Sequence, residues 1–207
     1  MFDLDHTLVD TPLDLAAMAR DMRATLERRC GPLPARPDRY RVGELIHWCQ
    51  AHAPDVEKLL WDIALDHERQ AMAIATLEAG AREAIDGARA AGFATAVWTN
   101  NAREVTAVAL ERFGLLPVLD LVVTRDEMRA LKPDPDGWRV IAAHFGAHRE
   151  AVVVGDSWVD GAAARAAGVP FVAYRARDAD LARWSITPVA WLDDLAALPA
   201  WLRRGVT

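Results

Sequence analysis

From about Gly80 onward, short apolar runs alternate with amphipathic helical stretches, and this alternation limits the fold more than any other feature of the sequence. The apolar runs cover residues 93–98, 121–123, 151–154, 169–173 and 189–191. Between them lie helical stretches over 82–91, 134–145 and 159–167, and one marked by Val105, Ala109 and Phe113. Glycine follows each of these stretches, as it commonly does at helix ends. The repeat predicts an α/β fold with a doubly wound parallel sheet.

The segment from Pro12 to Leu77 has a purely helical pattern. Its apolar residues step at three and four positions, first from Leu15 to Leu26 and again from Leu45 to Leu65. A connector rich in proline and arginine at 31–37 interrupts the pattern, and no strand is predicted. We therefore predict a small all-helical domain over 12–77, inserted into an α/β core domain formed by 1–11 and 78–207.

Charge and hydropathy exclude some partners. The chain has 24 basic and 30 acidic side chains, a net charge of −6, which disfavours nucleic acid because phosphate backbones require a positive face. No apolar run approaches the ~20 residues that cross a bilayer. The residues after Met1 resemble neither a secretory leader nor a transit segment, so we expect a cytoplasmic protein without a membrane partner.

Four carboxylates follow two of the predicted strands. Asp3 and Asp5 are two positions apart, so in a strand they point to one face and repel each other unless a cation or proton lies between them. Magnesium suits such a site because it prefers oxygen ligands and keeps waters and a substrate phosphate. Asp156 can supply a third carboxylate, and Asp160 lies in the first turn of the next helix. Taken alone, Asp3 or Asp156 could equally be a cap or turn residue.

Further polar residues are expected at the same rim, because ligands of open parallel sheets bind beyond the carboxyl ends of the strands. Thr99 and Asn100 follow one strand and open a helix, where hydroxyl, amide and backbone N–H groups face an anion. An ordinary helix N-cap is the alternative. Lys132 precedes the stiff segment Pro133-Asp134-Pro135, which fixes the direction of its ammonium group, although most lysines are simply solvated.

These segments match four motifs in order. Asp3-Leu4-Asp5-His6-Thr7 fits the pattern D-x-D-x-T, Thr99 fits a second motif, Lys132 within Lys-Pro-Asp-Pro a third, and Gly-Asp-Ser-Trp-Val-Asp at 155–160 a fourth. Together they resemble the haloacid dehalogenase-like hydrolase superfamily, in its phosphatase branch with a helical cap, similar to phosphoglycolate phosphatases. The helical insertion lies where these proteins carry their cap.

The resemblance implies an enzyme that hydrolyses the phosphate monoester of a small metabolite. Asp3 would be the nucleophile that forms an aspartyl-phosphate. Asp5 would protonate the leaving alcohol and then accept a proton from the hydrolytic water. The Asp3 carboxylate, the Asp5 backbone carbonyl and Asp156 would hold Mg²⁺.

Other matched residues would complete this site. Thr99, Asn100 and Lys132 would bind the phosphoryl oxygens, whose charge such a site must stabilise. Thr7 and Asp160 would support the site, Asp160 by positioning Lys132 or a metal-bound water.

The sequence departs from the family pattern at two places. His6 stands where the family usually carries glycine; it is either a plain substitution or one that alters the turn or meets the substrate. Only Met1 and Phe2 precede Asp3, whereas a central strand normally has about five or six residues. We therefore expect additional residues upstream of this Met1.

Alternative functions use the same residues. A phosphosugar mutase would return the phosphoryl group to its substrate instead of to water, and a catalytically impaired binding or regulatory protein would keep the fold alone. A dehalogenase does not need a second aspartate as acid, because halide leaves without a proton, so Asp5 favours phosphoryl chemistry. The substrate itself stays open. Arginines of the cap could bind a second anionic group or form a solvated face, namely Arg20, Arg23, Arg28, Arg36, Arg39 and Arg41.

Overall fold

The first residues of the chain form the centre of a parallel sheet. In this computed structural model, which describes residues 1–146 and 150–205, Phe2 bridges Val97 on one side and Val154 on the other. The Phe2 amide donates to the carbonyl of Ala96 at 2.8 Å, and the Asp3 amide donates to the carbonyl of Val154 at 2.9 Å. Asp3 therefore lies where this central segment leaves the sheet.

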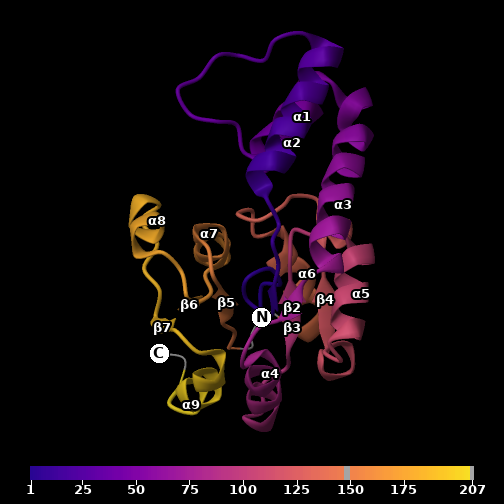
Figure 1. Cartoon of the computed structure of the whole chain (residues 1–207). Helices are drawn as coiled ribbons and strands as arrows, with labels where there is room; N and C mark the ends of the chain where they lie inside the picture. The colour runs from indigo at the N-terminus through magenta and orange to yellow at the C-terminus, as the bar shows by residue number, and fades with distance from the viewer. Residues whose placement is uncertain (147–149, 206–207) are drawn as a thin grey trace. The chain divides into compact units, whose positions relative to one another are not determined.

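The remaining strands extend the sheet on both sides in parallel register, in the order β4, β3, residues 1–3, β5, β6, β7 (Figure 1). Their bounds are Ala96–Trp98 for β3, Leu121–Val123 for β4, Val153–Gly155 for β5, Phe171–Tyr174 for β6 and Ala190–Leu192 for β7. Every residue of β3, β5 and β6 is buried, as expected for strands covered on both faces. The predicted α/β class with a parallel sheet is confirmed.

The strand β3 is shorter than the apolar run that predicted it. The amide of Thr95 donates a hydrogen bond to the Asp120 carboxylate at 2.8 Å, and its hydroxyl donates one to the Val118 carbonyl at 2.9 Å. The Thr95 amide therefore does not take part in the hydrogen bonds between strands, and residues 93–95 are not part of β3.

Helices surround this sheet. They are α4 (Ala81–Ala90), α5 (Arg103–Arg112), α6 (Asp136–Phe145), α7 (Trp158–Ala167), α8 (Asp178–Arg183) and α9 (Leu198–Leu202). One apolar cluster joins α6, α7 and α8 to the strands through residues such as Ile141, Ala163 and Leu181. Helix α6 begins at Asp136, two residues after the start of the predicted helical stretch; the Asp134 side chain accepts a hydrogen bond from the Asp136 amide at 2.9 Å. The short helices α8 and α9 were not predicted.

A second compact unit, Pro12–Ile74, contains only helices. These are α1 (Leu15–Cys30), α2 (Val42–His52) and α3 (Glu57–Ala73), which pack against one another (Figure 1). Met22, Leu26, Leu45 and Leu60 are fully buried in their shared core. Within the described residues, no helix combines the length and apolar composition needed to cross a bilayer.

The boundary between the units contains a strand pair that the helical pattern did not reveal. Strand β1 (Val9–Asp10) pairs antiparallel with β2 (Thr76–Leu77), so the expectation of no strand up to Leu77 is wrong. The first unit therefore comprises Met1–Thr11 and resumes at Ala75, instead of at residue 78. A strand of two residues is too short to produce a detectable sequence period.

Candidate active site

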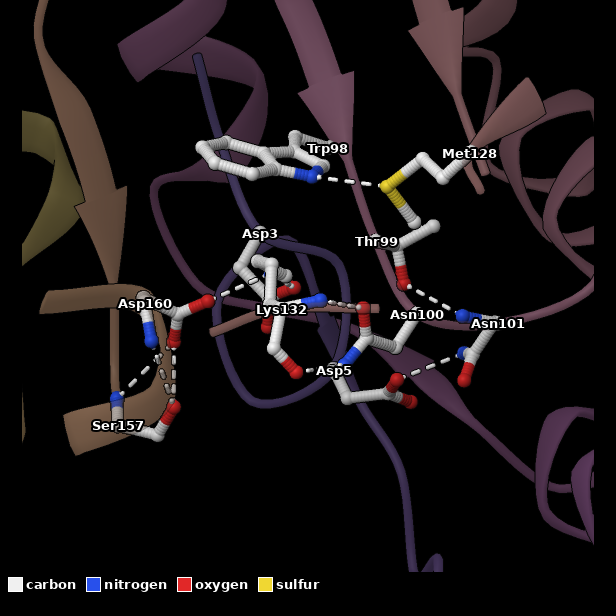
Figure 2. A network of polar contacts seen from close by, with 10 residues as sticks. All are labelled: Asp3, Asp5, Trp98, Thr99, Asn100, Asn101, Met128, Lys132, Ser157 and Asp160. Atoms are coloured by element: carbon white, nitrogen blue, oxygen red, sulfur yellow. Dashed lines mark hydrogen bonds and ion pairs between the residues drawn. The ribbon is translucent and has the colours of Figure 1, made fainter. Parts of the chain in front are cut away.

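A buried lysine lies between two aspartates at the carboxyl edge of the sheet (Figure 2). The Nζ of Lys132 donates to the Asp3 carboxylate at 2.6 Å and to the Asp160 carboxylate at 2.5 Å. The lysine side chain is only 3% exposed. Burial alone would lower the pKa of Lys132, but the charges of Asp160 and Asp3 raise it above its usual range. The lysine is therefore a permanent cation of the site, not the solvated surface lysine considered above.

The backbone of Lys132 is fixed by a carboxamide from another strand end. The Lys132 amide donates to Oδ1 of Asn100 at 2.8 Å, and Nδ2 of Asn100 donates to the Lys132 carbonyl at 3.0 Å. Figure 2 shows the Asn100 side chain turned toward this lysine. The Asn100 side chain thus positions Lys132, which we did not predict. The predicted contact of Asn100 with phosphate would have to come from the backbone atoms of Asn100.

Three carboxylates converge around the same point. Oxygen atoms of Asp3, Asp156 and Asp160 lie within 4.8 Å of one another. Burial raises the pKa of Asp3 to about 7 and the pKa of Asp156 to about 8, and the charge of Asp160 adds to both shifts. One ammonium group does not balance three carboxylates. The cluster thus fits a divalent cation, because oxygen ligands and excess negative charge are what Mg²⁺ requires.

Asp160 is held so that it faces the lysine. Ser157 caps helix α7: its hydroxyl donates to Oδ2 of Asp160 at 2.5 Å, and its amide donates to the same oxygen at 3.2 Å. The backbone of Gly155 passes directly beneath, since a Cβ atom there would lie 2.6 Å from Cβ of Asp160. Both oxygens of Asp160 are therefore occupied by Lys132 and Ser157, which leaves Asp3 and Asp156 as the carboxylates open to a cation.

Asp5 is bound on the other side of the site. Its Oδ1 accepts a hydrogen bond from the Thr11 hydroxyl at 2.8 Å, and its Oδ2 accepts one from Nδ2 of Asn101 at 2.6 Å. Burial raises the pKa of Asp5, and these two hydrogen bonds partly offset that increase. A carboxyl group with a raised pKa suits proton transfer near neutral pH. We did not predict the contact of Thr11 with Asp5, because Thr11 belongs to none of the four motifs. The only sequence signal for Asn101 is its position directly after a predicted strand.

The two threonines of the motifs are fully buried. The Thr99 hydroxyl accepts a hydrogen bond from the Asn101 amide at 3.2 Å, which is an Asx-like turn and not a helix cap of α5. The Thr7 hydroxyl has no hydrogen-bond partner among the described residues. Thr99 therefore shapes the loop at the strand end, beside Lys132 and Asn100.

The first motif turns sharply at the position where the family usually has glycine. His6 has a φ of +54°, in the left-handed region that glycine adopts without strain. Its amide donates to the carbonyl of Val9 at 2.7 Å, which closes the turn into β1. The substitution has therefore kept the glycine conformation, with a histidine side chain added.

Several arginines of the helical unit are engaged within that unit. Arg23 pairs with Glu27 at 2.8 Å, and Arg36 pairs with Glu44 at 3.1 Å. Such exposed pairs are typical of a solvated helix face.

Comparisons with known proteins agree with the motifs. The sequence profile of the haloacid dehalogenase-like hydrolases matches residues 1–174. A phosphoglycolate phosphatase of Nitrosospira multiformis is 32% identical over 180 residues, which cover 81% of this chain and 78% of that protein. A pyrophosphatase of Bacillus velezensis is 30% identical over 175 residues, again 81% of this chain and 78% of that protein. The crystal structure of a HAD family hydrolase from Deinococcus radiodurans, with bound phosphate and sodium, has a TM-score of 0.64 and 26% identity and covers 99% of this chain and 95% of that one.

Proposed function

Since the chain belongs to the haloacid dehalogenase-like hydrolase family, in its phosphatase branch, we propose that it is a Mg²⁺-dependent phosphatase acting on small phosphate monoesters through an aspartyl-phosphate. One observation carries the proposal: the Asp3 carboxylate lies 2.6 Å from a buried lysine and close to Asp156. A carboxylate beside positive charge in a water-poor site is an effective nucleophile toward phosphorus.

The proposed reaction has two steps. An oxygen of Asp3 attacks the phosphorus. The bond between phosphorus and the oxygen of the leaving alcohol breaks, and Asp5 donates a proton to this leaving oxygen. Asp5 then removes a proton from the water that attacks the aspartyl-phosphate, which releases inorganic phosphate and regenerates Asp3. The raised pKa of Asp5 supports this double role, because burial makes this carboxyl group easier to protonate than a solvated aspartate.

Positive charge stabilises both steps. Lys132 would bind the phosphoryl oxygens, with Thr99 and the backbone of Asn100 beside it, and Asp160 and Asn100 would keep the lysine in place. Asp3, Asp156 and the Asp5 carbonyl would hold Mg²⁺, which offsets the repulsion between a carboxylate and a phosphate dianion when bound. Thr7 would support the turn of the first motif.

The substrate would be a small phosphorylated metabolite, since the named relatives are a phosphoglycolate phosphatase and a pyrophosphatase. We propose that the enzyme acts in the cytoplasm.

The test is release of inorganic phosphate from p-nitrophenyl phosphate with Mg²⁺ and with EDTA. We expect Asp3→Asn to lower kcat by more than about a thousandfold, because the nucleophile is lost. Asp86→Asn is the matched control, since Asp86 lies on α4 and pairs with Arg82 at the surface. Full activity of Asp3→Asn would exclude the aspartyl-phosphate. No turnover by the wild type would favour a binding protein. In a parallel incubation with a sugar phosphate, an isomerised product without free phosphate would favour a mutase.

A further inference from the structure

A cavity of about 450 Å³ opens beside the acidic cluster within the sheet unit. Its walls include His6, Asp10, Glu78, Asp156, Trp158 and Arg175. Asp156 belongs both to this cavity and to the three-carboxylate cluster, so the cavity begins where the proposed phosphoryl site ends. A substrate bound at Asp3 would have room here for the part beyond its phosphoryl group.

Two walls of this cavity have strained backbones. Among the described residues, only His6, Arg175 and Ser185 have positive φ without being glycine, at +54°, +45° and +53°. Two of these three line the one cavity. Left-handed φ is costly for residues with a Cβ atom, and residues that keep it cluster at ligand sites. The strain therefore indicates that these two side chains have a function in the cavity.

The charged groups of the cavity are arranged as donor–acceptor pairs. Nδ1 of His6 lies 3.5 Å from the Asp10 carboxylate, and Nη1 of Arg175 donates to Glu78 at 2.7 Å. Arg177 and Asp180 also line the cavity and form an ion pair, with Nη1 of Arg177 3.8 Å from the Asp180 carboxylate. Each cationic or imidazole group thus has an acid beside it. A second anion on the substrate would meet these acids as well as the cations, which is unfavourable.

An aromatic side chain, Trp158, forms another part of the wall. Trp158 stacks on Trp184 with ring centroids 4.0 Å apart and an angle of 11° between the planes. Next to polar pairs, an apolar ring suits a ligand with both C–H faces and hydroxyl groups. A hydroxyl both donates and accepts hydrogen bonds, so it can be satisfied by either member of each pair.

We propose that this cavity binds the leaving-group part of the substrate, and that this part is uncharged and rich in hydroxyl groups, as in a sugar phosphate, with His6 and Arg175 determining specificity. The inference rests on the proposed function for the position of the phosphoryl group. It predicts a preference against phosphoglycolate, whose leaving group carries a carboxylate.

The experiment compares kcat/KM for ribose 5-phosphate, glucose 6-phosphate, phosphoglycolate and acetyl phosphate, using the full chain with Mg²⁺. We expect the better of the two sugar phosphates to exceed phosphoglycolate. His6→Gly removes the imidazole and relieves the strain, so folding is not at risk. We compare two values of kcat/KM, the one for the sugar phosphate divided by the one for acetyl phosphate. His6→Gly should lower this ratio about fivefold to tenfold, mainly by raising KM for the sugar phosphate, because one hydrogen bond to a hydroxyl is lost. Ser185→Gly relieves the same strain outside the cavity and should leave this ratio unchanged.

The outcomes separate this inference from the proposed function. Hydrolysis of acetyl phosphate together with a preference for phosphoglycolate, or an unchanged ratio in His6→Gly, overturns the inference alone. If none of the four phosphates is hydrolysed, the proposed function fails, and calorimetric titration of Asp3→Asn with the sugar phosphates and phosphoglycolate still decides the inference. Tighter binding of a sugar phosphate than of phosphoglycolate supports it; equal, reversed or absent binding overturns it.

Discussion

Replacing Lys132 by methionine measures how strongly the central cation stabilises the sheet unit. Methionine keeps most of the apolar stem but leaves Asp3 and Asp160 without the ammonium group that now lies 2.6 Å and 2.5 Å away. Removing one partner of a buried ion pair costs about 3–5 kcal/mol. For a unit of this size, about 2–4 °C of Tm correspond to each kcal/mol, so the Tm should fall by about 6–20 °C.

The assay is thermal unfolding followed by circular dichroism in EDTA, at pH 5.5 and pH 8. In the folded chain, burial already raises the pKa of Asp3 to about 7, well above its unfolded value of 3.8. The folded state thus binds more protons than the unfolded state between these values, and its stability falls as pH rises through about 7. Without Lys132 this pKa rises further, so the deficit of the variant should be larger at pH 8 than at pH 5.5.

Arg139→Met is the matched control, because Arg139 forms an ion pair at 3.2 Å with Asp136 but its side chain is 66% exposed. Its free energy of unfolding should change by less than about 1 kcal/mol. The reasoning is refuted if Lys132→Met loses no more stability than Arg139→Met at pH 8.

Two further changes test other parts of the structure. Gly155→Ala would place a Cβ atom 2.6 Å from Cβ of Asp160. We expect the free energy of unfolding, measured with urea, to fall by about 1–3 kcal/mol, and kcat to drop at least about tenfold because Asp160 shifts. An unchanged kcat would contradict the close approach. Thr11→Val removes a hydrogen bond that lowers the pKa of Asp5, so the acidic limb of the kcat–pH profile should move to higher pH; a superimposable profile would show that this contact does not tune the acid.

The sequence was informative where one periodic pattern dominates. The apolar runs near Val97, Val154 and Val172 predicted parallel strands because strands buried on both faces are almost continuously apolar. Once the strands are placed in parallel, their carboxyl ends meet, and residues as distant in sequence as Asp3 and Lys132 can be expected at one rim.

The contacts inside the rim could not be predicted in the same way. Asn100 holds the backbone of Lys132, and Thr11 binds Asp5, through side chains in loops, where no period relates sequence spacing to distance. The handedness of the turn at His6 was likewise invisible, because a residue other than glycine gives no signal for positive φ. These details depend on tertiary packing, and a motif comparison reveals only which residues to look for.

The pairing of β1 with β2 has a consequence for how such a chain can change. Asp10 faces Thr76 and Val9 faces Leu77, so the chain leaves the sheet unit and returns to it at neighbouring backbone positions. Topologically, the whole helical segment is an oversized hairpin loop. The entropy cost of closing a loop grows only slowly with the length of the loop. This segment can therefore be lengthened, trimmed or exchanged in evolution while β1 and β2 keep their register.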